Sequence, residues 1–277
     1  MKKPLVSQNL PHSKNGETAL NIAIKTAKEA GELLKDSFSK KRTVDFKGKG
    51  NVVTDADYLA EKHIIKSLIK EFPDFGIVSE ESPPIEKDSD YKWMIDPLDG
   101  TRNYASGIPH FCTVISLYYK NSVVLGVTYD PIRKELFWAS KNNGSFLNGE
   151  KIVVSVKKDL LQSVMGMDLG YIDKKAVTAF GLLGILFENI QGVRLLGSAA
   201  LSLAYVACGR LELYAHHHLY PWDISSGIIL VEEAGGIVKN KNGKALTSTD
   251  PSILASSNKT IMKEFLDISK NSKWDHL

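Results

Sequence analysis

The spacing of apolar residues divides the chain into helical and extended segments. Over residues 17–38, apolar side chains recur every three or four positions, which predicts an amphipathic helix. Residues 41–50 break this pattern with charges and two glycines, and a second helix is expected over 54–72. The short apolar run at 76–79 predicts a strand, and this strand ends at a pair of glutamates.

The sequence patterns predict different secondary structure for the two halves of the chain. Alternating apolar residues and turn signals predict strands at 113–119, 122–129 and 134–140, and Asn148-Gly149 predicts a further hairpin. Later segments alternate between extended and helical patterns, which favours an α+β first half with an antiparallel sheet and an α/β second half. We expect three parts: a flexible tail over 1–16, an α+β half over 17–157 and an α/β half over 158–277.

Composition narrows the classes of function. The chain is 43% hydrophobic and 24% charged, as in soluble globular proteins. Its 35 basic and 32 acidic residues give a net charge of +3, which is too even to indicate a nucleic-acid partner. The sequence predicts neither a signal peptide nor a membrane span, and Cys112 and Cys208 form no Cys-x-x-Cys pair. We therefore expect a cytoplasmic protein with free thiols and no membrane partner.

The segment from Trp93 to Thr101 carries the most specific chemistry. Its apolar run reads as a buried strand that stops at Asp96, and Asp99 follows three residues later beside Gly100, which permits a sharp turn. Two carboxylates so close in a low dielectric repel unless a cation lies between them, and compact oxygen ligands suit Mg²⁺. A short helix beginning at Gly100 would also point N–H groups at an anion. The segment therefore predicts a magnesium site beside a phosphate site.

Further acidic residues lie where predicted elements begin or end: Asp55, Asp57, Glu80, Glu81 and Asp223. Each has a structural explanation, since Asp57 fits a capping box, Asp223 meets a helix dipole and the glutamates fit a solvated loop. Strand ends and helix starts in layered α/β proteins commonly face one crevice, however. Together these carboxylates predict a site for about two divalent cations, a common device for hydrolysing phosphate esters.

Several motifs together resemble the inositol monophosphatase family of magnesium-dependent, lithium-sensitive phosphatases. The signature is Asp96–Tyr104, and the other matching segments are Val52–Asp57, Ser79–Ser82, Gly197–Ala200, Pro221–Asp223 and Glu233–Gly236. The resemblance extends from Glu17 to about Ser269. It implies a layered α/β/α/β/α sandwich, usually a homodimer, with two to three Mg²⁺ ions per subunit.

The resemblance also implies roles for individual residues. Glu80, Asp96 and the Leu98 carbonyl would hold a first Mg²⁺, while Asp96, Asp99 and Asp223 would hold a second. A third ion would lie near Glu80 and be reached from Asp57 through water. The implied catalytic residues are Thr101, Asp57 and Glu80, with Thr101 oriented by Asp57 so that it positions the attacking water. The implied mechanism is in-line attack by a metal-activated water on phosphorus.

The implied substrate is a small sugar or polyol phosphate, foremost myo-inositol monophosphate. The expected substrate contacts are Asp99, Gly100, Thr101, Gly197, Ser198, Ala199, His216 and Asp223. For Gly197-Ser198-Ala199, close packing of a small-residue helix is an equally good explanation. Relatives in the superfamily act on fructose 1,6-bisphosphate, phosphoadenosine phosphate, histidinol phosphate or NADP. A non-catalytic partner of the transcription or ribosome machinery is the alternative from another class.

The leaving-group contact departs from the family pattern. Inositol phosphatases carry a glutamate seven residues before the last metal aspartate, and His216 occupies that position here, at the start of a run of three histidines. A histidine can contact a hydroxyl or a second phosphate, whereas its structural alternative is a solvated loop. Metal binding by the run is disfavoured because neighbouring residues on a strand point to opposite faces. Basic residues that could contact an extra phosphate are Lys47, Lys49, Arg194 and Arg210.

Overall fold

The computed structural model describes residues 10–40, 44–48, 51–170, 174–247, 250–272 and 274. The elements of the first half are α1 Ala19–Phe38, β1 Val44–Gly48, β2 Asn51–Thr54, α2 Asp55–Glu71, β3 Gly76–Ser79, β4 Tyr91–Asp99, α3 Thr101–Ala105, β5 Cys112–Tyr119, β6 Ser122–Asp130, β7 Glu135–Ser140, β8 Gly144–Leu147 and β9 Glu150–Ile152. Those of the second half are β10 Val164–Met167, α4 Lys174–Leu186, β11 Gly192–Arg194, α5 Ala199–Ala207, β12 Leu213–His216, α6 Pro221–Glu233, β13 Ile237–Lys239, β14 Ile253–Ser256 and α7 Lys259–Ser269.

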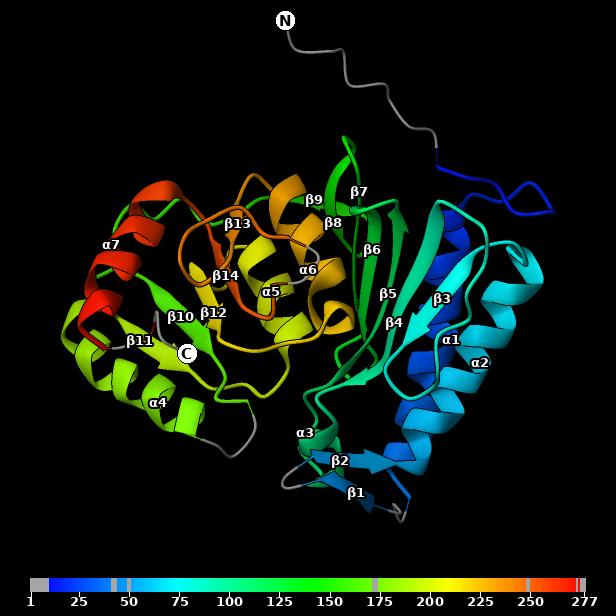
Figure 1. Ribbon diagram of the computed structural model, residues 1–277, viewed down its shortest axis with the longest axis horizontal. Coiled ribbons are helices and arrows are strands. Elements are labelled where there is room, and N and C mark those ends of the chain that lie inside the picture. Colours follow the sequence, from blue (N-terminus) through cyan, green and yellow to red (C-terminus); the bar gives the residue numbers. More distant parts are fainter. Residues whose placement is uncertain are drawn as a thin grey trace, which may run out of the picture.

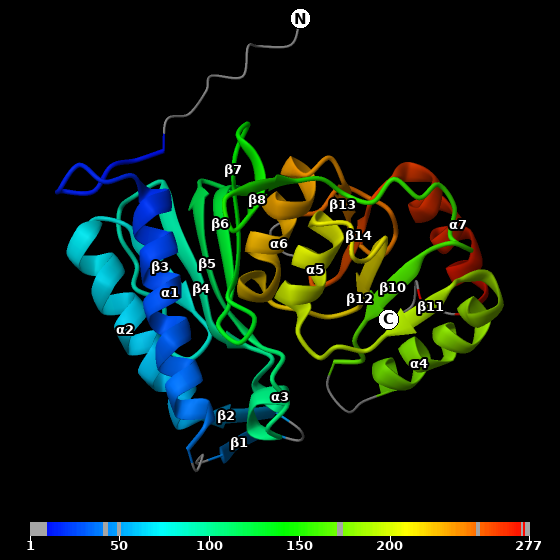
Figure 2. The ribbon, with the colours of Figure 1, turned by 180° about the vertical axis from the view of Figure 1, so that it is seen from behind.

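These elements form five layers (Figures 1 and 2). Helices α1 and α2 cover the outer face of a seven-stranded sheet of order β3-β4-β5-β6-β7-β8-β9. Helices α5 and α6 lie between it and a five-stranded sheet of order β11-β10-β12-β14-β13, whose other face is covered by α4 and α7. The predicted α/β/α/β/α sandwich is therefore confirmed.

The sheets are more mixed in direction than the sequence indicated. In the larger sheet β3 runs parallel to β4, while each later neighbouring pair is antiparallel. In the smaller sheet β10 is parallel to β11 and β12, but β14 is antiparallel to both β12 and β13. Residues 44–48 and 51–54, which include much of the segment where the helical pattern fails, form the antiparallel strand pair β1-β2.

Close packing of the central helices depends on glycine. A Cβ at Gly227 on α6 would lie 2.4 Å from Leu203 on α5, and one at Gly126 on β6 would lie 2.6 Å from the Ser226 backbone. Helix α6 therefore contacts both α5 and the larger sheet at van der Waals distance. This contact fixes the start of α6 relative to the end of β4, which matters for the site described below.

Part of the predicted tail packs on the fold. Leu10 contacts the core beneath α1, and the backbone N–H of Ser13 donates to the Glu17 carbonyl at 2.7 Å. The structure thus differs from the prediction at residues 10–16, while residues 1–9 lie outside the described residues. Both cysteines are free, as predicted. Among the described helices, none combines the length and apolar character that a bilayer crossing requires.

Candidate active site

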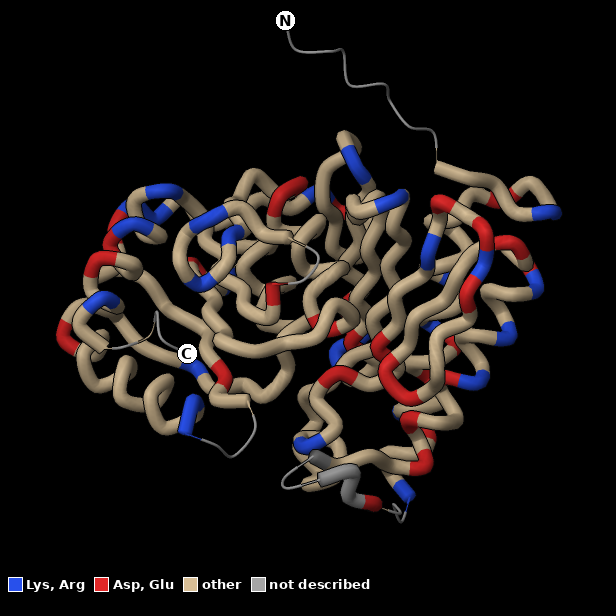
Figure 3. The backbone as a smooth tube through the Cα atoms, viewed as in Figure 1, with Lys and Arg blue, Asp and Glu red and all other residues tan. Residues whose placement is uncertain are grey.

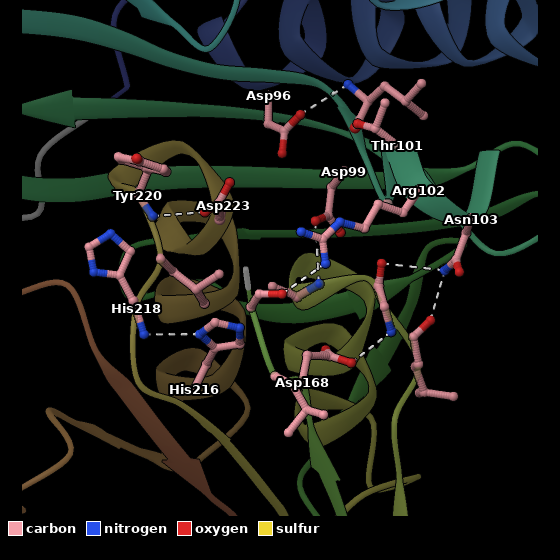
Figure 4. Close-up of a pocket in the computed structure, with 18 of the residues that line it drawn as sticks. Asp96, Asp99, Thr101, Arg102, Asn103, Asp168, His216, His218, Tyr220 and Asp223 are labelled. Carbon is pink, nitrogen blue, oxygen red and sulfur yellow. Dashed lines mark hydrogen bonds between the residues drawn. The ribbon is translucent and has the colours of Figure 1, made fainter. Parts of the chain in front are cut away.

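A cavity of about 370 Å³ opens where β4 and β12 end and where α3, α5 and α6 begin (Figure 4). Its walls come from both halves of the chain, so it exists only when the two sheets pack around α5 and α6. Most of the predicted site residues line it: Glu80, Asp96, Leu98, Asp99, Gly100, Thr101, Gly197, Ala199, His216 and Asp223.

Three carboxylates form a tight cluster in this cavity. Glu80, Asp96 and Asp223 each offer an oxygen, and these oxygens lie within 4.8 Å of one another. Burial, followed by repulsion from Glu80, raises the pKa of both Asp96 and Asp223 well above the usual range. Buried carboxylates in such a group are disfavoured as anions unless a cation joins them. The donor set is all oxygen and carries excess negative charge, so it fits Mg²⁺.

Local structure explains why the three residues meet. Glu80 directly follows β3, which pairs in parallel with β4, and the Glu80 N–H donates to the carbonyl of Ile95, the residue before Asp96. Asp223 lies in the first turn of α6, where it accepts from the backbone N–H of Tyr220 at 2.7 Å. The capping interaction and the cluster are therefore not alternatives for Asp223, because its carboxylate takes part in both.

Asp99 lies against the start of α5, where its carboxylate forms several hydrogen bonds. Its carboxylate accepts from the Ser198 hydroxyl and from the backbone N–H groups of Ala199 and Ala200, at 3.3 and 3.0 Å. Burial raises the pKa of Asp99 to about 6, although these hydrogen bonds oppose the rise. Ser198 and Ala199 thus contact Asp99 itself. The metal-binding role of Asp99 and the substrate contacts of Ser198 and Ala199 remain predictions.

A hydrogen bond joins Thr101 and Asp57, as the family resemblance implies. The Thr101 hydroxyl lies 3.3 Å from Asp57 Oδ1 and 2.9 Å from the Leu98 carbonyl oxygen. The second oxygen of Asp57 accepts from the backbone N–H and the hydroxyl of Thr54, at 2.9 and 2.6 Å, which completes the predicted capping box. Asp57 is fully buried, so α2 holds the carboxylate rigidly beneath Thr101.

His216 does not lie in a solvated loop. It is the last residue of β12, is only 2% exposed and lines the cavity. Its ring stacks on that of His217 with centroids 5.1 Å apart, so the two side chains do not point to opposite faces. The strand ends here, and the alternation expected within a strand no longer applies. The acidic cluster described above contains neither ring.

Four further residues organise the site without having been predicted. Glu61 on α2 accepts from the Glu81 N–H at 3.0 Å, and Asn103 on α3 donates to the Leu196 carbonyl at 2.8 Å. Asp168 and Arg102 line the cavity. Asp168 directly follows β10, so its position at the end of a strand offered a signal, whereas Glu61 lies in the middle of α2 and offered none.

Two of the basic residues proposed for an extra phosphate, Arg194 and Arg210, do not line the cavity. Arg210 makes a two-point ion pair with Glu135 at 2.5 and 2.7 Å, and Arg194 donates to the Val193 carbonyl. The Lys47 side chain and Lys49 lie outside the described residues. Figure 3 shows basic residues spread over several elements in that view rather than gathered in one stripe.

Comparison with known proteins agrees with this geometry. The sequence model of the inositol monophosphatase family matches residues 15–273. The Nus factor SuhB of Haemophilus influenzae is 40% identical over 223 residues, which cover 79% of this chain and 84% of that protein. The inositol monophosphatase of Dictyostelium discoideum is 38% identical over 234 residues, covering 81% and 85%. The crystal structure of the extragenic suppressor protein suhB from Bartonella henselae has a TM-score of 0.87 and 35% identity, covering 90% of this chain and 97% of that one. This chain therefore belongs to the inositol monophosphatase family.

Proposed function

We propose that the protein is a Mg²⁺-dependent phosphatase that hydrolyses the phosphate monoester of a small sugar or polyol. The observation that carries this proposal is the buried cluster of Glu80, Asp96 and Asp223 in a cavity of about 370 Å³. A cavity of this size accommodates a small phosphorylated alcohol. Family membership supports the same reaction class, and the inositol monophosphatase of Dictyostelium discoideum is one relative with that name.

The cluster would hold Mg²⁺ through Glu80, Asp96 and Asp223, with the Leu98 carbonyl and Asp99 as the further ligands that the family resemblance implies. Bound Mg²⁺ would supply positive charge that polarises the phosphate ester and lowers the pKa of water. Asp99 Oδ1 accepts from the Ala199 N–H at 3.3 Å, and each carboxylate oxygen has two lone pairs, so Asp99 could bind the ion while it keeps its contacts at the start of α5.

Thr101 would orient the attacking water. Its hydroxyl proton points to Asp57 Oδ1 or to the Leu98 carbonyl, at 3.3 and 2.9 Å, so an oxygen lone pair remains to accept from water. Asp57 is held by Thr54 on its other oxygen and thereby fixes the Thr101 rotamer. Gly100 adopts a left-handed conformation with φ 92°, and we propose that the Gly100 and Thr101 amides donate to the phosphate oxygens.

Phosphate release from a substrate panel tests this proposal. The panel contains myo-inositol 1-phosphate, fructose 1,6-bisphosphate, phosphoadenosine phosphate, histidinol phosphate and NADP, each with Mg²⁺ and with EDTA. We expect release from at least one compound with Mg²⁺ and none with EDTA. If every compound stays intact while calorimetry shows Mg²⁺ binding, the enzymatic proposal is wrong.

A binding role is the second candidate, because several similar proteins carry the name Nus factor SuhB. An even charge balance and the scattered basic residues favour a protein partner over a polynucleotide for such a role.

We further propose a homodimer. Helix α4 and the turn after it expose Val177, Phe180 and Phe187 at 73%, 60% and 75%, which suits burial against another chain. Sedimentation at micromolar concentration distinguishes a dimer from a monomer.

A further inference from the structure

A second cavity, of about 740 Å³, lies in the second half of the chain and shares no described lining residue with the active-site cavity. Its walls are α7, β13 and the turn that follows β13. Helix α7 belongs to the outermost helical layer, on the face of the smaller sheet that points away from α5 and α6 (Figure 1). The proposed phosphatase reaction therefore gives this cavity no role.

The base of this second cavity is apolar. Met262 and Trp274 are 6% and 1% exposed and belong to the core cluster on which α7 packs. Ile237 and Leu266 are half-buried at the edge of the same cluster, and they line the cavity from two sides, since one comes from β13 and the other from α7. A ligand in this cavity would cover apolar surface, which favours a ligand that carries an aliphatic or aromatic group.

The charged side chains around this second cavity are mostly cationic. The described lining contains five lysines and one aspartate, a net charge of +4, whereas the whole chain carries only +3. The lysines are Lys239, Lys241, Lys259, Lys263 and Lys270. Figure 3 shows basic residues, in blue, both on α7 and on the loop beside it. Positive charge is therefore more concentrated here than over the chain as a whole, and such a surface attracts anions.

Three of these lysines are not neutralised by an ion pair. Within the part of the chain that the structure describes, no carboxylate lies at ion-pair distance from Lys239, Lys259 or Lys263. The one lining aspartate, Asp267, pairs with Lys270 at 2.7 Å. The hydrogen bond and charge of Lys270, and then the charge of Lys263, lower the pKa of Asp267. The rim of the cavity therefore already favours a carboxylate in its charged form.

The spacing of the lysines indicates which class of anion fits. Lys259 and Lys263 lie four residues apart on α7, about 6 Å along its axis, and Lys270 lies roughly 10 Å further along. Charge spread over such a length exceeds what a single phosphate can meet. In an extended peptide, side chains on one face repeat about every 7 Å, and the alternate residues point to the opposite face. A peptide of alternating acidic and apolar residues therefore matches both the lysine spacing and the apolar base.

We propose that this second cavity binds a short extended segment of a partner protein in which acidic and apolar residues alternate. The inference gives the second candidate role, the binding of a protein partner, a surface on the molecule. It does not depend on phosphatase activity, because the two cavities are separate. A polynucleotide would need a longer basic track, whereas the basic residues elsewhere are spread over several elements (Figure 3).

Fluorescence anisotropy with a labelled hexapeptide, Glu-Leu-Asp-Phe-Glu-Leu, tests the inference. The titration is done in EDTA, so that the active-site carboxylates repel the peptide instead of holding it through a metal ion. We expect saturable binding at least about tenfold tighter than that of Gln-Leu-Asn-Phe-Gln-Leu, which lacks the charges, or of Glu-Gly-Asp-Gly-Glu-Gly, which lacks the apolar side chains. No saturation up to about 1 mM, or equal affinity for either control peptide, would overturn the inference.

A double variant shows whether the peptide binds at this cavity. Lys259→Glu with Lys263→Glu reverses two exposed charges on α7 and should weaken binding at least about tenfold. The matched control is Lys62→Glu with Lys66→Glu, which reverses two exposed lysines at the same spacing on α2 and should keep the affinity within about twofold. Equal weakening by the two double variants would show that the attraction is general and would refute the site.

Competition distinguishes the peptide from other anions. ATP and an oligothymidylate, both in EDTA, should displace the labelled peptide less effectively than the unlabelled peptide does. Tighter binding of either competitor, lost in the Lys259→Glu and Lys263→Glu double variant, would assign the cavity to a small anion or a nucleic acid and contradict the inference. Phosphate release is measured separately: peptide binding without turnover refutes only the phosphatase proposal, and turnover without peptide binding refutes only this inference.

Discussion

Glu61 provides a sensitive test of how the metal cluster is held in place. It lies on α2, is 3% exposed, and its carboxylate accepts from the Glu81 N–H at 3.0 Å and from the Ser82 hydroxyl. Both donors belong to residues directly after Glu80. A buried carboxylate from one helix therefore fixes the loop that presents Glu80 to the cavity.

Glu61→Gln keeps the shape of the side chain but replaces one acceptor oxygen with an NH₂ group. The NH₂ group would face the Glu81 N–H or the Ser82 hydroxyl, so one donor would lie against another. Hydrogen bonds to a charged group contribute about 1.5–3 kcal/mol, so we expect a loss of about 2 kcal/mol in the free energy of unfolding. For a chain of this size the corresponding fall in Tm is about 3–4 °C. Mutation of a residue that orients a metal ligand typically weakens metal binding by about 10–100-fold. We therefore expect Glu61→Gln to bind Mg²⁺ about 10–100-fold more weakly than the wild type.

Calorimetric titration with Mg²⁺ and thermal melts in EDTA measure the two effects separately. Glu29→Gln is the matched control, because Glu29 is a half-exposed glutamate on α1 that pairs with His63 at 3.0 Å. Exposed pairs of this kind contribute less than about 1 kcal/mol, so the control should keep wild-type Mg²⁺ affinity. If Glu61→Gln binds Mg²⁺ within twofold of the wild type, Glu80 is positioned by other contacts and our reasoning is wrong.

Two further predictions concern pH and packing. Burial raises the pKa of Asp96 and Asp223 well above the usual range and that of Asp99 to about 6, so their contribution to metal-free stability is present below about pH 4 and is lost as pH rises through the folded pKa values. Mg²⁺ must displace these protons at low pH, so it should raise Tm more at pH 7.5 than at pH 5.5; an equal or smaller increment at pH 7.5 would exclude these carboxylates as ligands. Gly227→Ala would place a Cβ 2.4 Å from Leu203 and should destabilise the fold by about 1–3 kcal/mol in urea unfolding. Gly181→Ala on α4, where a Cβ would meet nothing within 4 Å, is its control and should not destabilise; similar losses in both variants would show that α5–α6 packing is not the cause.

Sequence patterns predicted most helices and strands because each has its own periodicity, whereas the layered arrangement was implied by the resemblance to the inositol monophosphatase family. The capping box of Thr54 and Asp57 located the start of α2, and the glycine at position 100 located the start of α3. Strand direction was less predictable. The antiparallel β13 and β14 of the second half have the same local pattern as parallel strands, and the paired strands β1 and β2 are too short to show alternation.

Most acidic residues of the site were predictable from their positions at element ends, but the partners of Asp99 were not. Sequence spacing cannot show that the start of α5 binds Asp99, because the contact joins residues about a hundred positions apart. The same limit applies to His216, whose burial depends on packing between β12 and neighbouring loops. Asp168 and Arg102 come from different halves of the chain, and they line the same cavity only because the two halves pack together.

Mg²⁺-dependent phosphate release by Asp96→Asn tests the central claim most directly. Asp96 is buried in the cluster, while Asp90, just before the same strand, is exposed beside Lys120 and serves as the control for the same substitution. We predict that wild-type protein and Asp90→Asn release phosphate from the panel only with Mg²⁺, and that Asp96→Asn loses at least about a thousandfold in turnover while remaining folded. Turnover by Asp96→Asn close to that of the wild type, or wild-type turnover that persists in EDTA, would contradict the account.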